Sequence, residues 1–198
     1  MTIRTDLPSR QQLRNMLRER RRALSAAAQQ QAAEAVCQQL LSTLTKQTRL
    51  IAGYLANDGE VILNPTLSAC QQRGVAVSLP VLHPFSGKHL LFQHYTPQTP
   101  MTHNRFGISE PELNSTQIHL LNHHDMLLMP LVGFDANGNR LGMGGGFYDR
   151  TLAHLHHLSK RPLLVGLAHD CQQVDALPVE AWDIPLDCIV TPTQIINL

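Results

Sequence analysis

The stretch DMLLMPLVGFDANGNRLGMGGGFYDRTL, residues 125–152, joins a strongly apolar run to four glycines in five positions. The apolar run at 125–134 predicts a strand buried on both faces, as in a parallel sheet. The glycines that follow can turn several backbone N–H groups toward a ligand. In open α/β sheets, ligands bind beyond the carboxyl ends of the strands, so this order predicts a binding turn at that edge.

On both sides of this stretch, short apolar runs alternate with helical patterns, which predicts an α/β fold with an open, mostly parallel sheet flanked by helices. Further strands are expected at 49–56, 75–80, 90–95, 162–168 and 187–192, and helices at 9–24, 26–44, 63–72 and 146–158. Residues 96–112, rich in proline and polar residues, predict a long loop over the site. We expect a single domain over 1–198, with amino-terminal helices in 1–45 packing on the α/β core.

The composition predicts a globular protein, with 43% hydrophobic and 16% charged residues and a net charge of +1. That charge gives no whole-molecule attraction to nucleic acid or to an anionic membrane. No segment approaches the roughly 18 to 20 apolar residues of a spanning helix, and no signal peptide is recognisable. Cys37, Cys70, Cys171 and Cys188 form no CxxC pair and are expected to be buried, reduced thiols. We expect a cytoplasmic monomer without nucleic-acid or membrane partners.

The glycine turn fits neither of two familiar phosphate loops. A Walker loop needs a lysine, and none occurs between Lys88 and Lys160. A GxGxxG fingerprint fails because Phe147 stands where the third glycine is required. A general anion cradle of backbone N–H groups remains. From the glycines alone, a tight structural connection, with Asp149 complementing the first turn of the helix, fits equally well.

The longer stretch LVGFDANGNRLGMGGGFYDRTL, residues 131–152, resembles the signature of the 5-formyltetrahydrofolate cyclo-ligase family, also called methenyltetrahydrofolate synthetases. RQQLR at 10–14, YLANDGE at 54–60 and IPLDCIVTP at 184–192 resemble further family elements. The resemblance implies a fold similar to ribose-phosphate isomerase and coenzyme A transferase-like proteins. It also implies ATP- and Mg²⁺-dependent conversion of 5-formyltetrahydrofolate to 5,10-methenyltetrahydrofolate, with release of ADP and phosphate.

The resemblance further implies that ATP phosphorylates the formyl oxygen, after which the neighbouring folate nitrogen closes the ring. The protein then has mainly to position the substrates and neutralise charge. The implied ATP-binding residues are Arg10, Arg14, Arg140, Gly142, Met143, Gly144, Gly145, Gly146, Phe147 and Tyr148. Arg10 and Arg14, one helical turn apart, can offer two cations to the polyphosphate.

Two further groups of residues are assigned by the resemblance. Arg140, Tyr148 and Asp149 are the implied catalytic residues, and Asp149 with Asp187 would supply hard oxygen ligands to Mg²⁺. The implied folate-binding residues are Leu55, Glu60, Phe106, Gly144, Gly145, Gly146 and Phe147. The Glu60 carboxylate suits the donor-rich edge of a pterin ring.

Three positions depart from the family pattern, which usually has Lys at Arg10, may have Trp at Phe106 and often has Tyr at Phe147. These departures leave open a non-catalytic nucleotide- or folate-binding protein on the same fold. A sugar-phosphate isomerase would need no ATP and would leave the amino-terminal arginines unexplained. The arginine-rich run at 18–22 predicts a solvated helical face, and the histidines at 154–157 match no zinc motif.

Overall fold

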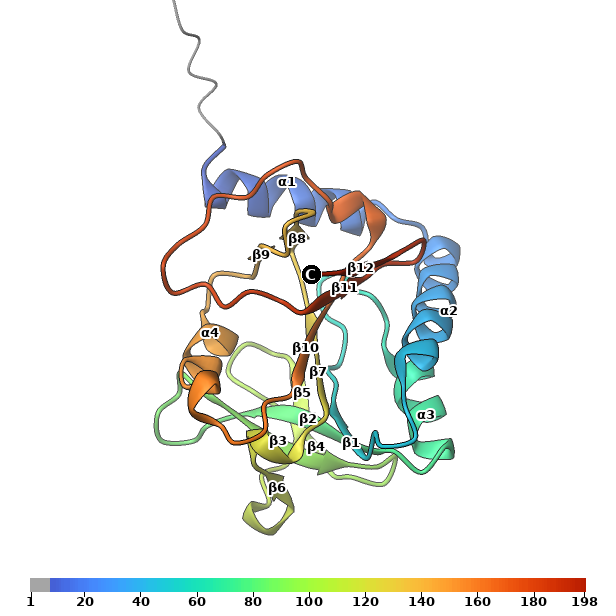
Figure 1. Cartoon of the computed structure of the whole chain (residues 1–198), viewed down its shortest axis with the longest axis vertical. Helices are drawn as coiled ribbons and strands as arrows, with labels where there is room; N and C mark the ends of the chain where they lie inside the picture. Colours follow the sequence, from blue (N-terminus) through green and yellow to red (C-terminus); the bar gives the residue numbers. More distant parts are fainter. Residues whose placement is uncertain (1–7) are drawn as a thin grey trace, which may run out of the picture.

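The computed structural model describes residues 8–198 and shows an eight-stranded sheet between two layers of helices (Figure 1). In spatial order the strands are β12 (Ile195–Asn197), β11 (Cys188–Val190), β10 (Leu163–Leu167), β7 (Met126–Pro130), β1 (Leu50–Ala52), β2 (Ala76–Leu82), β3 (Leu90–Tyr95) and β6 (Ile118–His119). The five strands from β11 to β2 are parallel, and the others add antiparallel edges. The predicted open, mostly parallel α/β sheet is confirmed. Residues 1–7 of the predicted amino-terminal segment lie outside the described residues.

Helices cover both faces of the sheet because its central strands are apolar on both sides. Alternate residues of β7 enter opposite cores, with Met126 and Leu128 on one face and Leu127 and Met129 on the other. Figure 1 shows α2 (Ala26–Thr43) and α3 (Asn64–Gln72) against one face and α4 (Phe147–Leu152) against the other. The β7 strand predicted from the sequence is therefore the centre of the fold.

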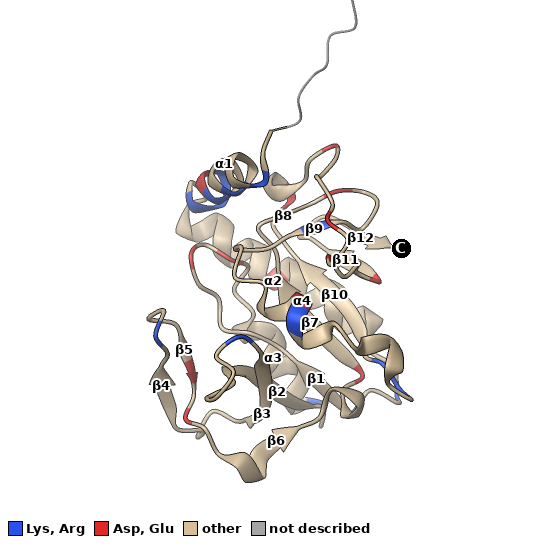
Figure 2. Cartoon of the chain, turned by 90° about the vertical axis from the view of Figure 1, so that its left-hand side faces the viewer, with Lys and Arg blue, Asp and Glu red and all other residues tan. Residues whose placement is uncertain are grey.

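Helix α1 (Arg10–Arg22) lies apart from these two layers. Ser9 and Gln12 form a capping box at its start. Leu13 and Leu17, one turn apart, pack against the pair of β8 (Gly133–Phe134) and β9 (Arg140–Leu141). A side chain at Gly133 would collide with Leu17, so this glycine permits the close approach of α1. Figure 2 shows that basic residues gather along this helix.

Several parts of the fold differ from the sequence prediction. Residues 96–112 contain a hairpin of β4 (Met101–His103) and β5 (Ser109–Pro111), where a loop was predicted. All three β4 side chains are exposed, so no buried face marks this strand in the sequence. The helix predicted at 146–158 ends at Leu152 and gives way to a 3-10 turn, and the short strands β6, β9 and β12 were not predicted. The 3-10 turns are η1 (Ser115–Gln117), η2 (Leu121–His123), η3 (Leu155–His157) and η4 (Asp170–Gln172).

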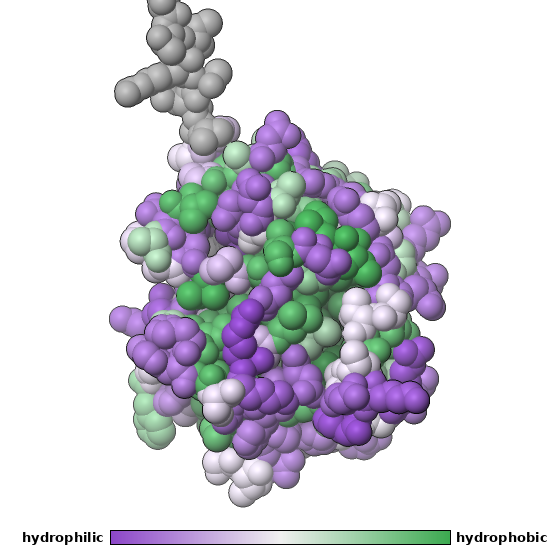
Figure 3. Space-filling model, viewed as in Figure 1, coloured by the Kyte–Doolittle hydropathy of each residue, from purple (hydrophilic) through white to green (hydrophobic). Residues whose placement is uncertain are grey.

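The surface and the thiols add two observations. Hydrophobic and hydrophilic residues are interspersed on the face seen in Figure 3. Within residues 8–198, no helix is both long and apolar enough to cross a bilayer.

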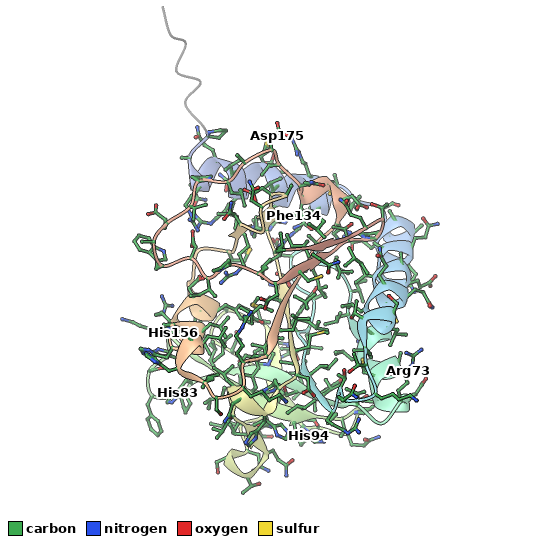
Figure 4. The ribbon with its side chains drawn as sticks, viewed as in Figure 1. Arg73, His83, His94, Phe134, His156 and Asp175 are labelled. Atoms are coloured by element: carbon green, nitrogen blue, oxygen red, sulfur yellow. The ribbon has the colours of Figure 1, made fainter. Side chains whose placement is uncertain are left out.

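All four cysteines are free, and Cys37, Cys70 and Cys188 are buried while Cys171 is half-buried. In Figure 4, Phe134 lies in the interior below α1, whereas His94 and His156 lie at the periphery in different parts of the molecule.

Candidate active site

A cleft of about 1210 Å³ opens at the carboxyl edge of β1, β2 and β7, where α1, the glycine turn and the β4–β5 hairpin meet. It is larger than the roughly 300–1,000 Å³ typical of sites for one drug-sized ligand, so it has room for two substrates. The predicted residues that line it are Arg10, Arg14, Leu55, Glu60, Phe106, Arg140, Gly142, Met143, Gly144, Gly145, Gly146, Phe147, Tyr148 and Asp149. The structure thus brings together every predicted site residue except Asp187.

The glycine turn, residues 142–146, presents its backbone to the cleft. Gly144 and Gly146 have φ values of 94° and 62°, in the left-handed region that favours glycine. The Nε of Arg14 donates a hydrogen bond to the Gly142 carbonyl at 2.9 Å. In a trans peptide the C=O and the N–H point in opposite directions, so the Met143 N–H points away from Arg14. Among residues 8–198, no protein group accepts a hydrogen bond from the N–H groups of 142–145. These donors are available to an anion in the cleft.

Gly144→Ala is expected to weaken anion binding in the cleft about tenfold, because a strained left-handed alanine shifts the backbone N–H groups of the turn. The new methyl group would also stand 3.4 Å from the Arg14 guanidinium carbon. Gly74→Ala is the matched control, since Gly74 has a similar φ of 76°, a methyl group added there would meet nothing within 4 Å, and the residue lies outside the cleft. Both variants should lose stability in thermal unfolding, and only Gly144→Ala should weaken the binding of inorganic polyphosphate, measured by calorimetry.

Four arginines line the cleft, and the three that were predicted are each anchored by the protein. Arg140 is buried and bonds the Asp149 carboxylate and the Ile184 carbonyl. Arg10 lies 2.5 Å from Asp183, and its hydrogen bond with this carboxylate raises the pKa of the guanidinium. Burial and the nearby Arg10 lower the pKa of Arg14. These cations are positioned before any ligand arrives, which reduces the cost of ordering them on binding.

The opposite half of the cleft holds a buried carboxyl group. Glu60 ends the turn at 57–60, and its Oε2 accepts the Asn57 N–H at 3.0 Å. Its side chain is 11% exposed, and burial raises its pKa to about 7. Tyr54 donates its hydroxyl to the Val61 carbonyl at 2.9 Å, and burial raises the pKa of both Tyr54 and Tyr148. Because its pKa is about 7, the Glu60 carboxyl group can change charge near neutral pH.

Aromatic rings form a wall between these two halves. Phe106, at the tip of the β4–β5 hairpin, meets Phe147 edge to face, with ring centroids 5.7 Å apart. Phe106 is 55% exposed, so most of its ring is free to contact a ligand. Leu55, which follows β1, adds apolar surface. The wall suits a flat heteroaromatic ligand.

The structure does not bring Asp187 to Asp149. Asp187 stands at the amino end of β11, where it accepts the Leu164 N–H at 2.8 Å and pairs with Arg161. The amino ends of parallel strands lie at the edge opposite the cleft, so a magnesium ion shared by these two residues does not fit. The carboxylate that this segment sends into the cleft is Asp183.

Sequence reasoning also missed a group of residues beside the cleft. The run at 18–22 was predicted to be a solvated face, yet the Arg21 side chain is fully buried and pairs with Asp58. The prediction is wrong for Arg21, which follows Leu13 and Leu17 at intervals of four and shares their buried side of the helix. It holds for Arg20 and Arg22, which are exposed. Trp182, 66% exposed, stands at the cleft rim and had no periodic signal.

The chain is similar in sequence to known proteins. The model of the 5-formyltetrahydrofolate cyclo-ligase family matches residues 6–192. The 5-formyltetrahydrofolate cyclo-ligase of Haemophilus influenzae is 48% identical over 178 residues, covering 89% of this chain and 94% of the relative. The enzyme of the same name from Escherichia coli K12 is 45% identical over 181 residues, covering 91% and 98%.

A solved structure is also similar. The 5,10-methenyltetrahydrofolate synthetase of Aquifex aeolicus superposes with a TM-score of 0.79 at 29% identity, covering 95% of this chain and 92% of that one. The parallel sheet with a basic, glycine-lined cleft at its carboxyl edge defines an α/β protein built to bind anionic ligands. The chain belongs to the 5-formyltetrahydrofolate cyclo-ligase family. The resemblance noted from residues 131–152 is confirmed.

Proposed function

We propose that the cleft holds ATP, Mg²⁺ and 5-formyltetrahydrofolate together and closes the folate ring through a phosphorylated formyl group. As a member of this family, the chain is an ATP-dependent ligase that converts 5-formyltetrahydrofolate to 5,10-methenyltetrahydrofolate. One observation carries the proposal: the anchored cations, the glycine turn and the aromatic wall line a single cleft. A protein that bound only ATP or only the folate would not need both the cationic, glycine-lined side of the cleft and the aromatic side.

The ATP phosphates lie against residues 142–146 in this proposal. The unpaired N–H groups of the turn, Arg14 and Arg10 supply donors and positive charge to the polyphosphate. Arg140 stands deeper, where it can neutralise charge that develops on the transferred phosphoryl group. Met143, Phe147 and Tyr148 complete this side of the cleft.

Magnesium fits the donors on this side of the cleft. Asp149 and Asp183 both line it, and among the described residues no group of three His, Cys, Asp or Glu side chains could hold a metal. Mg²⁺ in nucleotide sites is usually bound by one or two carboxylates, substrate phosphates and water, which matches this donor set. Asp149 would hold the ion, with Asp183 nearby, and the ion would neutralise phosphate charge.

The folate occupies the other half. The pterin edge carries N–H donors, and the ionised Glu60 carboxylate accepts them, while Leu55, Phe106 and Phe147 contact the ring faces. Residues 144–146 then lie against the formyl group as well as the phosphates. The Tyr148 hydroxyl stands beside the reacting atoms and, with a raised pKa, remains a neutral donor.

The chemistry follows from this placement. The formyl oxygen attacks the γ-phosphorus, ADP leaves, and the formyl carbon now carries a phosphate leaving group. The N10 nitrogen attacks that carbon and gives up its proton, which the departing phosphate can carry away. Phosphate leaves with the original formyl oxygen, and the 5,10-methenyl ring remains. The protein positions both substrates and excludes water, since an activated formyl group would otherwise be hydrolysed.

An isotope experiment tests this route. With 5-formyltetrahydrofolate labelled by ¹⁸O in the formyl group, released phosphate should carry the label in every turnover. Mass spectrometry of the phosphate measures this directly. Unlabelled phosphate formed together with the methenyl product would exclude transfer to the formyl oxygen, and phosphate release without added folate would favour a different ATP-dependent activity.

We further propose that the enzyme acts as a cytoplasmic monomer without nucleic-acid or membrane partners. The four free thiols and the net charge of +1 support this view. Sedimentation at micromolar concentration tests the oligomeric state, with a mass near the 22.0 kDa of one chain as the expected result.

A further inference from the structure

Helix α1 connects the two halves of the cleft. At its start, Arg10 and Arg14 line the phosphate side. At its end, Arg18, Arg21 and Arg22 all bond Asp58, in the turn that carries Glu60. Neither Arg21 nor Asp58 lines the cleft, so nothing in the proposed chemistry uses them. Their contacts need another explanation.

Arg21 bridges three separate segments. Its Nε donates to the Asp58 carbonyl at 2.8 Å, and its Nη2 donates to the Asp58 carboxylate at 2.8 Å. Its Nη1 donates to the Leu131 carbonyl, at the carboxyl end of β7, at 3.0 Å. Nη2 also lies 3.7 Å from the Met143 sulfur in the glycine turn. A planar guanidinium with fixed donors holds these segments in one relative position.

Asp58 is a strained residue held by charge. Its φ of 55° is in the left-handed region, and it is the only non-glycine residue with positive φ among those described. Burial disfavours its ionised form, but hydrogen bonds from Arg18, Arg22 and Arg21 outweigh this effect and lower its pKa. Exposed ion pairs contribute little to stability. Stabilisation of a surface turn therefore does not explain why three arginines bond one carboxylate.

Glu60, two residues further along the chain, interacts electrostatically with both Arg21 and Asp58. Its Oε1 lies 3.9 Å from Arg21 Nη2. The charged and titratable groups facing Glu60 are Arg21 from α1, Asp58 from its own turn, Tyr54 after β1 and Tyr148 from α4. Arg21 favours the ionised form of Glu60, and Asp58 disfavours it. The pair therefore acts on the position of Glu60 and on its charge.

We propose that Arg21 and Asp58 are positioning residues for the folate half of the site, which fix the Glu60 turn against the glycine turn. This inference rests on the proposed function, in which Glu60 binds the pterin ring. Loss of the pair should loosen the folate side more than the phosphate side, where Arg21 contacts only the Met143 sulfur. The KM for formylfolate should therefore change more than the KM for ATP.

Two variants and a matched control test the proposal. Asp58→Asn keeps a residue that tolerates left-handed φ but removes the charge, and Arg21→Gln removes the opposite charge. Arg22→Gln is the matched control. Arg22 bonds the same Asp58 carboxylate, but its side chain is 52% exposed and does not contact Leu131 or Met143. We expect Asp58→Asn and Arg21→Gln to raise the KM for formylfolate about tenfold or more, as for a lost buried charge pair. Arg22→Gln should change it less than about threefold.

The pH profile separates positioning from a general loss of structure. The midpoint of the KM for formylfolate against pH should move to higher pH in Arg21→Gln, which loses the cation favouring ionised Glu60. It should move to lower pH in Asp58→Asn, which loses the competing anion. Damage to the fold would not move the midpoints in opposite directions, so shifts of one sign would overturn the proposal.

Wild-type turnover is the reference that distinguishes this inference from the proposed function. A wild-type protein that forms no methenyl product would contradict the proposed function itself. Active wild type and Arg22→Gln, with an unchanged formylfolate KM in a folded Asp58→Asn protein, would contradict only the positioning role. If Arg21→Gln does not fold, Asp58→Asn alone tests the positioning role. Its KM for formylfolate should rise, and the midpoint of that KM against pH should move to lower pH.

Discussion

Asp149→Asn is expected to lower kcat about a thousandfold while leaving formylfolate affinity within about threefold of wild type, as for loss of a group that stabilises transition-state charge. Asparagine has nearly the same shape and can still accept the hydrogen bond from Arg140, so the local fold should survive. What it loses is the negative charge proposed to hold Mg²⁺ beside the phosphates. Steady-state kinetics give kcat, and calorimetry gives the formylfolate Kd.

Asp187→Asn is the matched control for this prediction. The substitution is chemically identical but lies outside the cleft, on a carboxylate paired with Arg161 and the Leu164 N–H. It should reduce stability and leave kcat close to wild type. Equal loss of turnover in both folded variants would restore Asp187 as a metal ligand and contradict the geometry described above.

Glu60→Gln is expected to weaken formylfolate binding about 100-fold at pH 8, because it removes charge-assisted hydrogen bonds to the pterin donors. At pH 8 the wild-type carboxyl is largely ionised, since its pKa is about 7. Below that pH the wild type should lose affinity as Glu60 takes up a proton, and the variant should show no such loss. Titration calorimetry at pH 6 and pH 8 measures both effects.

The same substitution should stabilise the fold, and the sign follows from proton binding. Burial raises the pKa of Glu60 from 4.5 to about 7, so between these values the folded protein binds more protons than the unfolded chain. The contribution of Glu60 to stability therefore falls as pH rises, by up to about 3 kcal/mol above pH 7. Urea unfolding at pH 5 and pH 8 should show Glu60→Gln gaining stability relative to wild type at the higher pH. A constant difference would contradict the buried, ionised carboxylate.

Much of the fold could be predicted because its strongest elements carry local signals. The β7 run is apolar on both faces, and Leu13 and Leu17 mark the inner side of α1. The β4–β5 hairpin could not be predicted, since its strands are held by backbone pairing and bury little. Local patterns register burial, and they carry little information where burial is small.

The site was predictable to the extent that it is contiguous in sequence. Residues 140–149 carry both a motif and a turn, so they indicate where anions bind. Asp187 does not line the cleft with the other predicted residues, because its place at the amino end of a short strand, rather than its residue type, decides which edge of the sheet it occupies. The spacing of Arg21 after Leu13 and Leu17 marks its side of the helix, but its partners, Asp58 and the Leu131 carbonyl, are distant in sequence and no local pattern reveals them.

The most direct measurement is the near-ultraviolet absorbance of 5,10-methenyltetrahydrofolate after the pure protein is mixed with 5-formyltetrahydrofolate, Mg²⁺ and ATP, and again without ATP. A shared cleft for both substrates predicts a rise only when ATP is present, accompanied by one ADP for each methenyl product. No rise from a folded protein that still binds ATP would contradict the proposed chemistry while leaving the phosphate cradle in place.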